Sequence, residues 1–343
     1  MNITTERLTK VHPGGRRALD AVDLHIDRGT VGLLGANGAG KTTLLRILTG
    51  VLRPTSGRVT VAGHDLSTSH GLTAVKRTLG YLPQELSLYP DLTAREFLDY
   101  IGVLKGMRDK RTRRTQVEAK IAEVGLEDRA DERLAGFSGG MKRRVGIAQA
   151  LMGDPSVLII DEPTTGLDPH ERMRFRALLA GLGGGRTVLL STHILDDVAQ
   201  TCPEVAVLTA GRLVFHDTTA ALVSQAAGCT YAFKAAGPPP GAEVVSAVTT
   251  AEGPEYRIVT THPPEGARPV EPSLEDGYAA LLCADGKARA PERANSSQTD
   301  SRPDRSEPTG ASGSAGNPRH SSGSDSSSGS DSSNSSDSEV ANT

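Results

Sequence analysis

The feature that most constrains this chain is a glycine-rich segment at residues 35–42, Gly-Ala-Asn-Gly-Ala-Gly-Lys-Thr, which has the form GxxxxGK[ST]. A short apolar run precedes it and a helix-forming stretch follows, which is the strand–loop–helix context of a phosphate-binding P-loop. Backbone N–H groups of such a loop turn inward around phosphate oxygens, and the N-terminus of the helix favours an anion. The predicted ligand is therefore a nucleotide phosphate with Mg²⁺.

The P-loop residues divide by their chemistry. Lys41 supplies a positive charge to the phosphates, and Thr42 offers a hydroxyl to Mg²⁺. The alternative, a glycine-rich turn that only begins a helix, is less favoured because strand, loop and helix occur in the required order. The predicted nucleotide-binding residues are Gly35, Asn37, Gly38, Gly40, Lys41, Thr42 and Thr43.

A second motif is an apolar run at residues 157–160 that ends in two carboxylates, Asp161 and Glu162. At the end of a buried strand, Asp161 can hold Mg²⁺ through water. Successive strand residues point to opposite sides, so Glu162 is free to polarise an attacking water as a general base. In isolation such a run is as often structural as catalytic, but its combination with a P-loop favours catalysis.

A third motif, Phe-Ser-Gly-Gly-Met at residues 137–141, precedes a basic amphipathic stretch. Ser138 and Gly140 at a helix start predict a second anion cradle. One chain has little use for two cradles unless the second serves a neighbour's nucleotide, which predicts a head-to-tail pair of chains. Taken alone, a serine N-cap followed by glycines is the simpler interpretation.

Composition limits the partners and the compartment. The chain has 38 Lys+Arg against 41 Asp+Glu, no Trp and only 3% aromatic residues, so neither bulk charge nor base stacking favours nucleic acid, and no nucleic-acid partner is expected. Three widely separated cysteines fit neither a disulfide framework nor a zinc site and indicate a reducing compartment. No stretch approaches the roughly 18 apolar residues of a spanning helix, so any membrane function is expected from the aqueous side.

The pattern along the chain predicts an α/β fold with a mostly parallel sheet in residues 1–220 and an inserted helical subdomain at about 83–154. The pattern in residues 221–290 predicts that this segment forms a small α+β appendage. Residues 291–343 are rich in Ser, Gly and Asp and are expected to be disordered. Strands are expected at residues 30–34, 58–61, 157–160, 187–190, 205–208, 230–234, 243–248 and 256–261, and helices at 41–49, 91–105, 115–124, 139–152, 170–180 and 274–282.

Taken together, these motifs resemble the nucleotide-binding subunit of an ABC transporter. Walker A lies at residues 35–42, the Q-loop at 81–85, the signature at 137–141, Walker B at 157–162, the D-loop at 166–169 and the switch histidine in 191–193. The resemblance covers about residues 1–220 and implies the P-loop NTPase fold and an Mg²⁺-dependent ATPase. Two departures are His12, where the family often stacks an aromatic ring on adenine, and a signature with Phe137 and Met141 in place of Leu and Gln.

The resemblance also assigns roles. Gln84 would sense Mg²⁺ and the attacking water, and His193 would contact the γ-phosphate and hold Glu162. Asp168 would lie near the seam of a homodimer, where Ser138 and Gly140 reach the partner's nucleotide. The implied catalytic residues are Glu162, His193 and Gln84, and the implied metal ligands are Thr42, Gln84 and Asp161.

Residues 80–107 and the Pro-Ser-Leu-Glu-Asp sequence at 272–276 resemble the bacterial drug and antibiotic exporter branch. That branch implies a separate integral-membrane permease subunit, contacted around residues 86–92, and a position on the cytoplasmic face of the plasma membrane. One alternative is a soluble ABC ATPase that acts on a non-transport partner. A P-loop GTPase or kinase is disfavoured, because no Asn-Lys-x-Asp motif occurs and a kinase does not explain residues 137–141.

Overall fold

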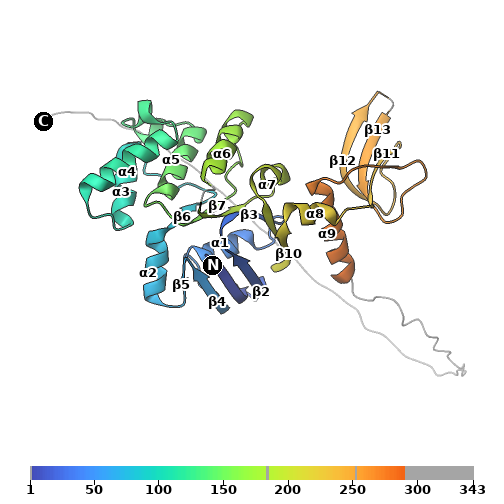
Figure 1. Cartoon of the computed structure of the whole chain (residues 1–343), viewed down its shortest axis with the longest axis horizontal. Coiled ribbons are helices and arrows are strands. Elements are labelled where there is room, and N and C mark those ends of the chain that lie inside the picture. The colour runs from blue at the N-terminus through green and yellow to red at the C-terminus, as the bar shows by residue number, and fades with distance from the viewer. Residues whose placement is uncertain (1, 183–184, 252, 290–343) are drawn as a thin grey trace, which may run out of the picture. The chain divides into compact units, whose positions relative to one another are not determined.

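A six-stranded sheet with strand order β10-β9-β3-β8-β7-β6 forms the centre of the nucleotide-binding region (Figure 1). All neighbouring strands in it pair in parallel except β9 and β10. Its strands are β3 (Gly29–Leu34), β6 (Leu79–Leu82), β7 (Val157–Asp161), β8 (Thr187–Ser191), β9 (Glu204–Thr209) and β10 (Arg212–Thr218). Every residue of β7 and β8 is buried, as expected for parallel strands covered on both faces. The predicted α/β fold with a mostly parallel sheet is confirmed.

The computed structural model describes residues 2–182, 185–251 and 253–289. All of these belong to one unit that spans Met1–Pro291. The segment 291–343, for which the sequence predicts disorder, lies outside the described residues.

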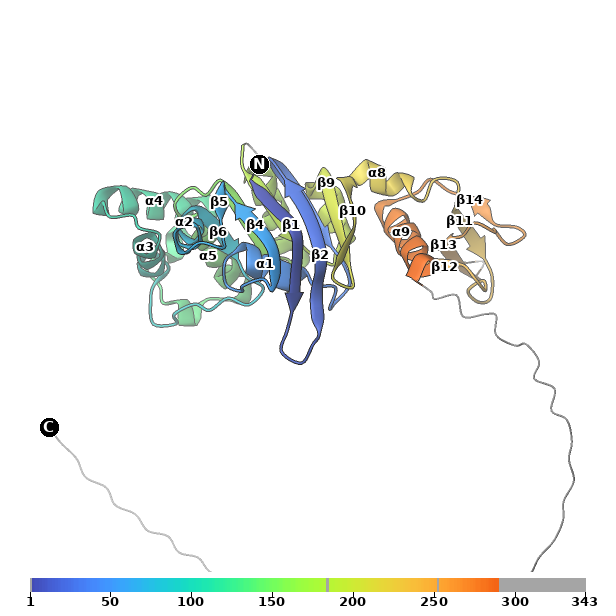
Figure 2. The same ribbon diagram turned by 90° about the horizontal axis from the view of Figure 1, so that it is seen from below.

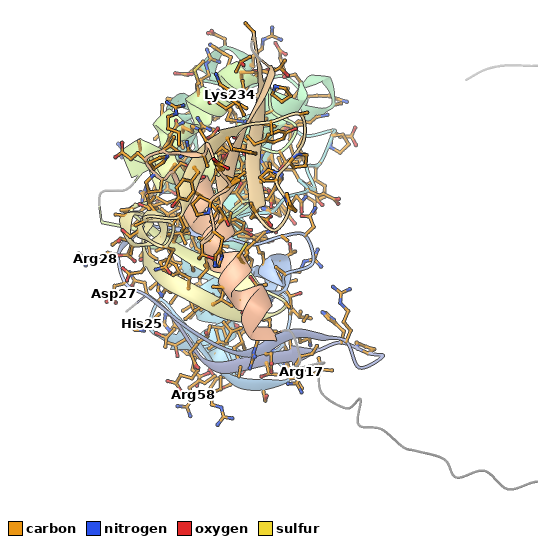
Figure 3. All side chains as sticks on the ribbon, turned by 90° about the vertical axis from the view of Figure 1, so that its right-hand side faces the viewer. Arg17, His25, Asp27, Arg28, Arg58 and Lys234 are labelled. Atoms are coloured by element: carbon orange, nitrogen blue, oxygen red, sulfur yellow. The ribbon has the colours of Figure 1, made fainter. Side chains whose placement is uncertain are left out.

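A second, antiparallel sheet has the order β2-β1-β4-β5 (Figure 2). Its strands are β1 (Ile3–Val11), β2 (Arg17–Ile26), β4 (Ser56–Val61) and β5 (His64–Asp65). Only β4 was expected from the sequence; the β1–β2 hairpin was missed. In β2, buried and exposed residues alternate from Val22 to Ile26, so His25 is exposed; Arg58 on β4, on the other side of β1, is exposed too (Figure 3). This alternation is typical of a sheet with one solvated face.

Helix α1 (Lys41–Leu48) joins the two sheets through one apolar core. Leu44, Leu45, Ile47 and Leu48 are buried in the same cluster as residues of β1, β2, β3 and β4. The P-loop, which ends where α1 begins, is therefore anchored on two sides.

Between β6 and β7 the described residues form helices and no strand. They comprise α3 (Ala94–Leu104), α4 (Lys110–Glu123), the short 3₁₀ helices at Glu127–Arg129 and Leu134–Gly136, and α5 (Gly139–Leu151). Two helix starts differ from expectation because caps define them. Thr93 and Glu96 form a capping box, so α3 begins at Ala94. Asp109 accepts from the Thr112 N–H at 2.6 Å, so α4 begins five residues earlier than the apolar pattern alone indicates.

The remaining helices of the nucleotide-binding region are α2 (Ser69–Thr78), α6 (Pro169–Leu182), α7 (Leu195–Thr201) and α8 (Thr219–Ser224). The part of the chain that follows has a four-stranded sheet with the order β12-β13-β11-β14 and one long helix. These elements are β11 (Thr230–Lys234), β12 (Glu243–Thr250), β13 (Gly253–Val259), β14 (Arg268–Pro269) and α9 (Leu274–Arg289). The sequence located α9 but ended it at residue 282.

An ion pair attaches α9 to this sheet. Asp276 on α9 is fully buried, and Arg257 on β13 donates to it from Nε at 2.9 Å and from a terminal nitrogen at 2.6 Å. The backbone N–H and the hydroxyl of Ser273 donate to the same carboxylate at 2.6 and 2.7 Å. Burial by itself raises the pKa of Asp276, but these hydrogen bonds outweigh it, and the pKa lies below the usual 3.8.

We expect Asp276→Asn to lower the free energy of unfolding at pH 7 by about 3 kcal/mol, because it leaves the partly buried guanidinium of Arg257 without its counter-charge. Urea titration followed by circular dichroism measures this, with the exposed neighbour Glu275→Gln as the control. A carboxylate with a lowered pKa stabilises the fold above the ordinary value and loses that contribution below it. The difference from wild type should therefore shrink as the pH falls below 3.8. Equal stability of wild type and variant at pH 7 would contradict the assignment.

Candidate functional site

Glycine is required at two positions of the P-loop by its close approach to neighbouring backbone. Gly35 has φ +156°, and a Cβ there would lie 2.4 Å from the Leu208 carbonyl oxygen of β9. Gly40 has φ +109°, and its Cβ would lie 2.5 Å from the Ala18 carbonyl oxygen of β2. Both contacts are shorter than a side chain allows, so the shape of the loop depends on these glycines.

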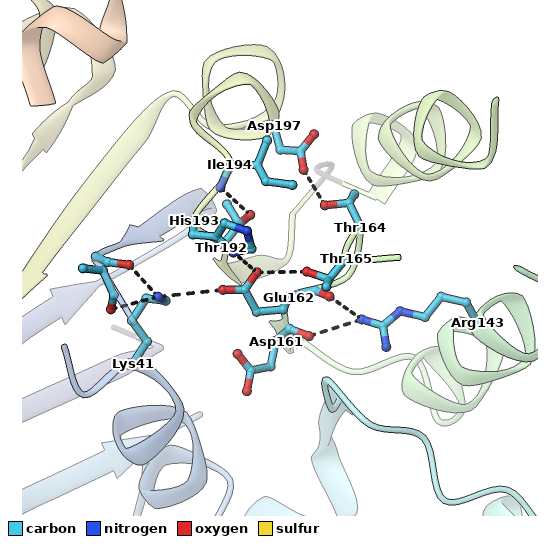
Figure 4. Close-up of polar contacts among 12 residues, drawn as sticks. Lys41, Arg143, Asp161, Glu162, Thr164, Thr165, Thr192, His193, Ile194 and Asp197 are labelled. Carbon is cyan, nitrogen blue, oxygen red and sulfur yellow. Dashed lines mark hydrogen bonds and ion pairs between the residues drawn. The ribbon is translucent and has the colours of Figure 1, made fainter. Parts of the chain in front are cut away.

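Lys41 begins α1 and turns back over the loop. Its side chain is 7% exposed, and Nζ donates to the Gly35 carbonyl at 2.6 Å and lies 3.8 Å from Glu162 Oε1 (Figure 4). Two motifs that lie far apart in the sequence, Walker A and Walker B, thus meet at this ammonium group.

A cavity of about 350 Å³ lies at the mouth of the P-loop. Its volume is within the usual range of small-molecule sites. The predicted residues that line it are Asn37, Gly38, Gly40, Lys41, Thr42, Thr43, Gln84, Glu162 and His193. Four further lining residues were not among those predicted: Arg16, Ala18, Thr165 and, within the P-loop motif, Ala36. Among the described residues, Arg16 and Ala18 represent the β1–β2 hairpin in this lining; His12 is not part of it.

Asp161 lies behind this cavity at the end of β7. It is 1% exposed, and among the described residues its Oδ1 and the Ser191 hydroxyl on β8 have no hydrogen-bond partner. Burial raises the pKa of Asp161, and the negative charge of Glu162 adds to this, while nearby Ser191, Lys41 and Thr42 oppose it. Buried oxygens without partners are costly, and a hard cation is the partner that such a donor set fits.

The donor set therefore fits Mg²⁺ held jointly with phosphate. The Thr42 hydroxyl and the Gln84 side chain line the cavity beside the P-loop. Among the described residues, no group of three or more His, Cys, Asp or Glu could hold a metal.

Glu162 is held in an unusual backbone conformation. Its φ is +47°, and its N–H donates to the Ser191 carbonyl at 2.9 Å, so the chain turns sharply as it leaves β7. The carboxylate is largely buried, with Oε2 2.7 Å from His193 Nδ1 and accepting from the Thr165 hydroxyl at 3.3 Å (Figure 4). An acidic side chain fixed at the edge of a cavity is suited to accept a proton.

Five predicted residues are not part of this cavity lining: Gly35 and Asp161, described above, and Ser138, Gly140 and Asp168. Ser138 is exposed and caps α5, accepting from the Met141 N–H at 3.2 Å. Asp168 is exposed and accepts from the Glu171 N–H at 2.9 Å at the start of α6. Gly140 lies beside Glu171, where a Cβ would meet that side chain at 3.2 Å. Within one chain, then, Ser138 and Asp168 cap helices, and their roles toward a partner chain stay predictions.

Comparison with known proteins agrees with this geometry. A family model described as ABC transporter matches residues 19–165. The daunorubicin resistance ATP-binding protein DrrA3 of Streptomyces coeruleorubidus is 39% identical over 217 residues, which cover 63% of this chain and 68% of that protein. The Nod factor export ATP-binding protein I of Paraburkholderia xenovorans is also 39% identical, over 63% of this chain and 71% of that protein. The chain belongs to the ABC transporter family.

Solved ABC structures show the same fold. The ATP-binding cassette MJ0796, in a dimeric post-hydrolysis state bound to ADP and Pi, matches with a TM-score of 0.58 and 28% identity, over 63% of this chain and 98% of that one. An ATP-binding subunit of an ABC transporter matches with a TM-score of 0.60 and 30% identity, over 66% and 93%. The match to the human retinal-specific phospholipid-transporting ATPase ABCA4, 39% identical, spans only 10% of that protein. Among the described residues of this ABC protein, no helix has the length and apolar character needed to cross a membrane.

We expect Gly40→Ala to weaken ATP binding at least tenfold, because the new methyl group meets the Ala18 carbonyl and its φ is unfavourable for alanine. Isothermal titration with ATP measures the dissociation constant. Gly286→Ala is the matched control, since that helical glycine has open space around it. An unchanged dissociation constant in Gly40→Ala would show that the loop does not need this conformation.

Proposed function

We propose that this chain is the Mg²⁺-dependent ATP-hydrolysing subunit of an ABC exporter and energises a separate membrane-spanning subunit. The observation that carries the proposal is the convergence of Lys41, Glu162 and His193 on one cavity at the P-loop. The names of two relatives add support, since one is a daunorubicin resistance protein and the other a Nod factor export protein. A drug-like or antibiotic molecule is accordingly the proposed cargo.

ATP binding follows from the loop geometry. The backbone N–H groups of residues 36–41 and the start of α1 provide a positive environment for the β- and γ-phosphates. Lys41 already points its ammonium group to the mouth of the loop, where it balances phosphate charge. The side chain of Arg16, which lines the same cavity, is placed to contact the nucleotide from the hairpin side.

A bound Mg²⁺ would supply positive charge against the negative charge of the phosphates during transfer. Thr42, Asp161 and Gln84 are the residues proposed to hold it. The burial of Asp161 serves this purpose, because a carboxylate kept from water gains more from a cation than one already solvated.

Hydrolysis requires a water oxygen to attack the γ-phosphorus while the bond to the bridging oxygen breaks. Glu162 accepts the proton of that water through its carboxylate. His193 Nδ1, 2.7 Å from Oε2, fixes the rotamer of this carboxylate and leaves the other ring nitrogen available to the γ-phosphate. Thr165 adds a second hydrogen bond from the opposite side of the loop.

The dimer and the membrane partner belong to the same proposal. Ser138 and Asp168 are exposed and lie outside the chain's own cavity, as expected if they serve a second copy. Tyr89 and Tyr100 are 52% and 41% exposed and stack edge-to-face at 5.7 Å. This exposed aromatic pair beside residues 86–92 is proposed to receive the permease, with the chain on the cytoplasmic face of the membrane.

Glu162→Gln tests the mechanism. We expect the rate of ATP hydrolysis to fall about 10²–10⁴-fold, since the amide cannot accept the proton, while ATP binding persists. The bound, unhydrolysed ATP should hold two copies together, which sedimentation velocity at saturating ATP and Mg²⁺ would detect as a dimer.

Glu127→Gln makes the same charge change at an exposed position of the helical segment and should retain wild-type hydrolysis. A Glu162→Gln chain that stays monomeric at saturating ATP would contradict the dimer mechanism. If Glu162→Gln hydrolysed ATP at the wild-type rate, Glu162 would not be the general base.

A further inference from the structure

Arg143 on α5 is the most heavily bonded buried cation near the site. It is 7% exposed, and within the described residues its guanidinium group donates to backbone carbonyl oxygens alone; Figure 4 shows the bonds to Asp161 and Glu162. Two of these acceptors belong to the Q-loop, at Pro83 (2.9 Å) and Gln84 (3.0 Å). Three follow β7, at Asp161 (3.2 Å), Glu162 (2.9 Å) and Pro163 (3.0 Å).

This arrangement is costly and therefore informative. Buried charges are normally paired, yet none of the hydrogen bonds from Arg143 reaches a carboxylate oxygen of the described residues. Burial lowers the pKa of Arg143 to about 10, with the negative charge of Asp161 opposing the shift, so the side chain stays protonated at neutral pH. The dipoles of the carbonyl groups, together with the more distant carboxylate of Asp161, stabilise the positive charge of Arg143. They belong to the two loops that hold the proposed catalytic side chains.

The guanidinium is planar and rigid, so its acceptors cannot move independently of each other. One side chain thus joins the backbone of Gln84, the backbone of Glu162 and helix α5. The N-terminus of the same helix carries Ser138 and Gly140, the residues proposed to reach a partner's nucleotide. A shift of α5 is therefore transmitted directly to the turn that sets the Glu162 carboxylate.

We propose that Arg143 is a positioning residue that couples the seating of α5 to the geometry of Gln84 and Glu162, so that hydrolysis proceeds only when the signature helix is in place. This inference rests on the function proposed above and adds to it a means by which the helical segment controls the hydrolytic base. Arg143 is not among the residues that line the P-loop cavity.

The competing explanation is that Arg143 only stabilises the fold. The two explanations predict different effects of a substitution at Arg143. If Arg143 only stabilises the fold, its substitution lowers stability, but the molecules that still fold keep the wild-type kcat. A positioning residue changes kcat while leaving ATP binding intact, because the P-loop and Lys41 lie outside the Arg143 bonds.

The experiment uses the full chain with Arg143→Lys and Arg143→Met. Lysine keeps the charge but has three donors on a flexible stem and cannot reproduce the planar fork. We expect kcat to fall about tenfold in Arg143→Lys and about 100-fold in Arg143→Met, since displacement of a reacting group by about 1 Å costs this much. The dissociation constant for ATP measured without Mg²⁺ should stay within about threefold of wild type, because the P-loop contacts persist.

Lys105→Met is the matched control. Lys105 is a partly buried cation of the helical segment that donates to a backbone carbonyl, that of Leu79 at 3.0 Å, but its bond is to the start of β6 and to neither catalytic loop. Its kcat should remain within about twofold of wild type if the effect depends on the Arg143 acceptors rather than on any attachment of the helices.

Amide hydrogen exchange gives a second readout. In Arg143→Lys, exchange should accelerate at residues 84–86 and 162–165 and stay unchanged in α1 and in the core strands. A kcat within threefold of wild type in folded Arg143→Lys and Arg143→Met would overturn the inference. The inference would also be overturned if the fall in kcat were no larger than the fraction of the variant that is unfolded. Should Arg143→Met not fold, Arg143→Lys decides alone. A wild-type chain that binds ATP but never hydrolyses it would instead overturn the proposed function.

Discussion

The parallel pairing of β3, β8 and β7 is the constraint on which the site depends. In this register Leu33 on β3 and Asp161 on β7 both pair with Ser191 on β8. Parallel strands end at the same edge of a sheet, so the P-loop, the turn at Glu162 and the switch histidine His193 emerge side by side, although they are distant in the sequence. The apolar side chains that bury β7 and β8 thereby fix the distances within the catalytic group.

The strain at this edge falls on Glu162. A positive φ at a residue other than glycine costs on the order of 1–3 kcal/mol and persists only where the surroundings over-determine it. Here the Ser191 carbonyl takes the Glu162 N–H, Arg143 donates to the Glu162 carbonyl, and His193 contacts the carboxylate. Backbone and side chain are thus held by two different segments, the end of β8 with the residues directly after it and helix α5, which gives the proposed base one orientation and links that orientation to α5.

Much of this architecture was readable from the sequence because it follows short local patterns. The motifs at 35–42 and 157–162 predicted the cavity, and apolar runs predicted the parallel strands β3, β7, β8 and β9 but not β6. The β1–β2 hairpin was missed although Val22, Leu24 and Ile26 alternate with polar residues. The nucleotide cavity accordingly includes Arg16 from that hairpin rather than His12. Arg143 could not be found, because its partners are backbone carbonyls as far as sixty positions away and carry no residue signature.

If this ATPase drives a separate membrane protein, affinity capture with the tagged chain should recover that protein. The tagged full chain would be isolated from detergent-solubilised membranes of its own host, and bound proteins identified and quantified. We expect one polytopic membrane protein to be recovered in near-equal amount. It should no longer be recovered when Tyr89 and Tyr100 are changed to Ala, and should still be recovered with Glu162→Gln. Recovery of ribosomes, DNA or no partner, with ATP hydrolysis intact, would contradict the transporter assignment and favour an ABC ATPase with a soluble partner.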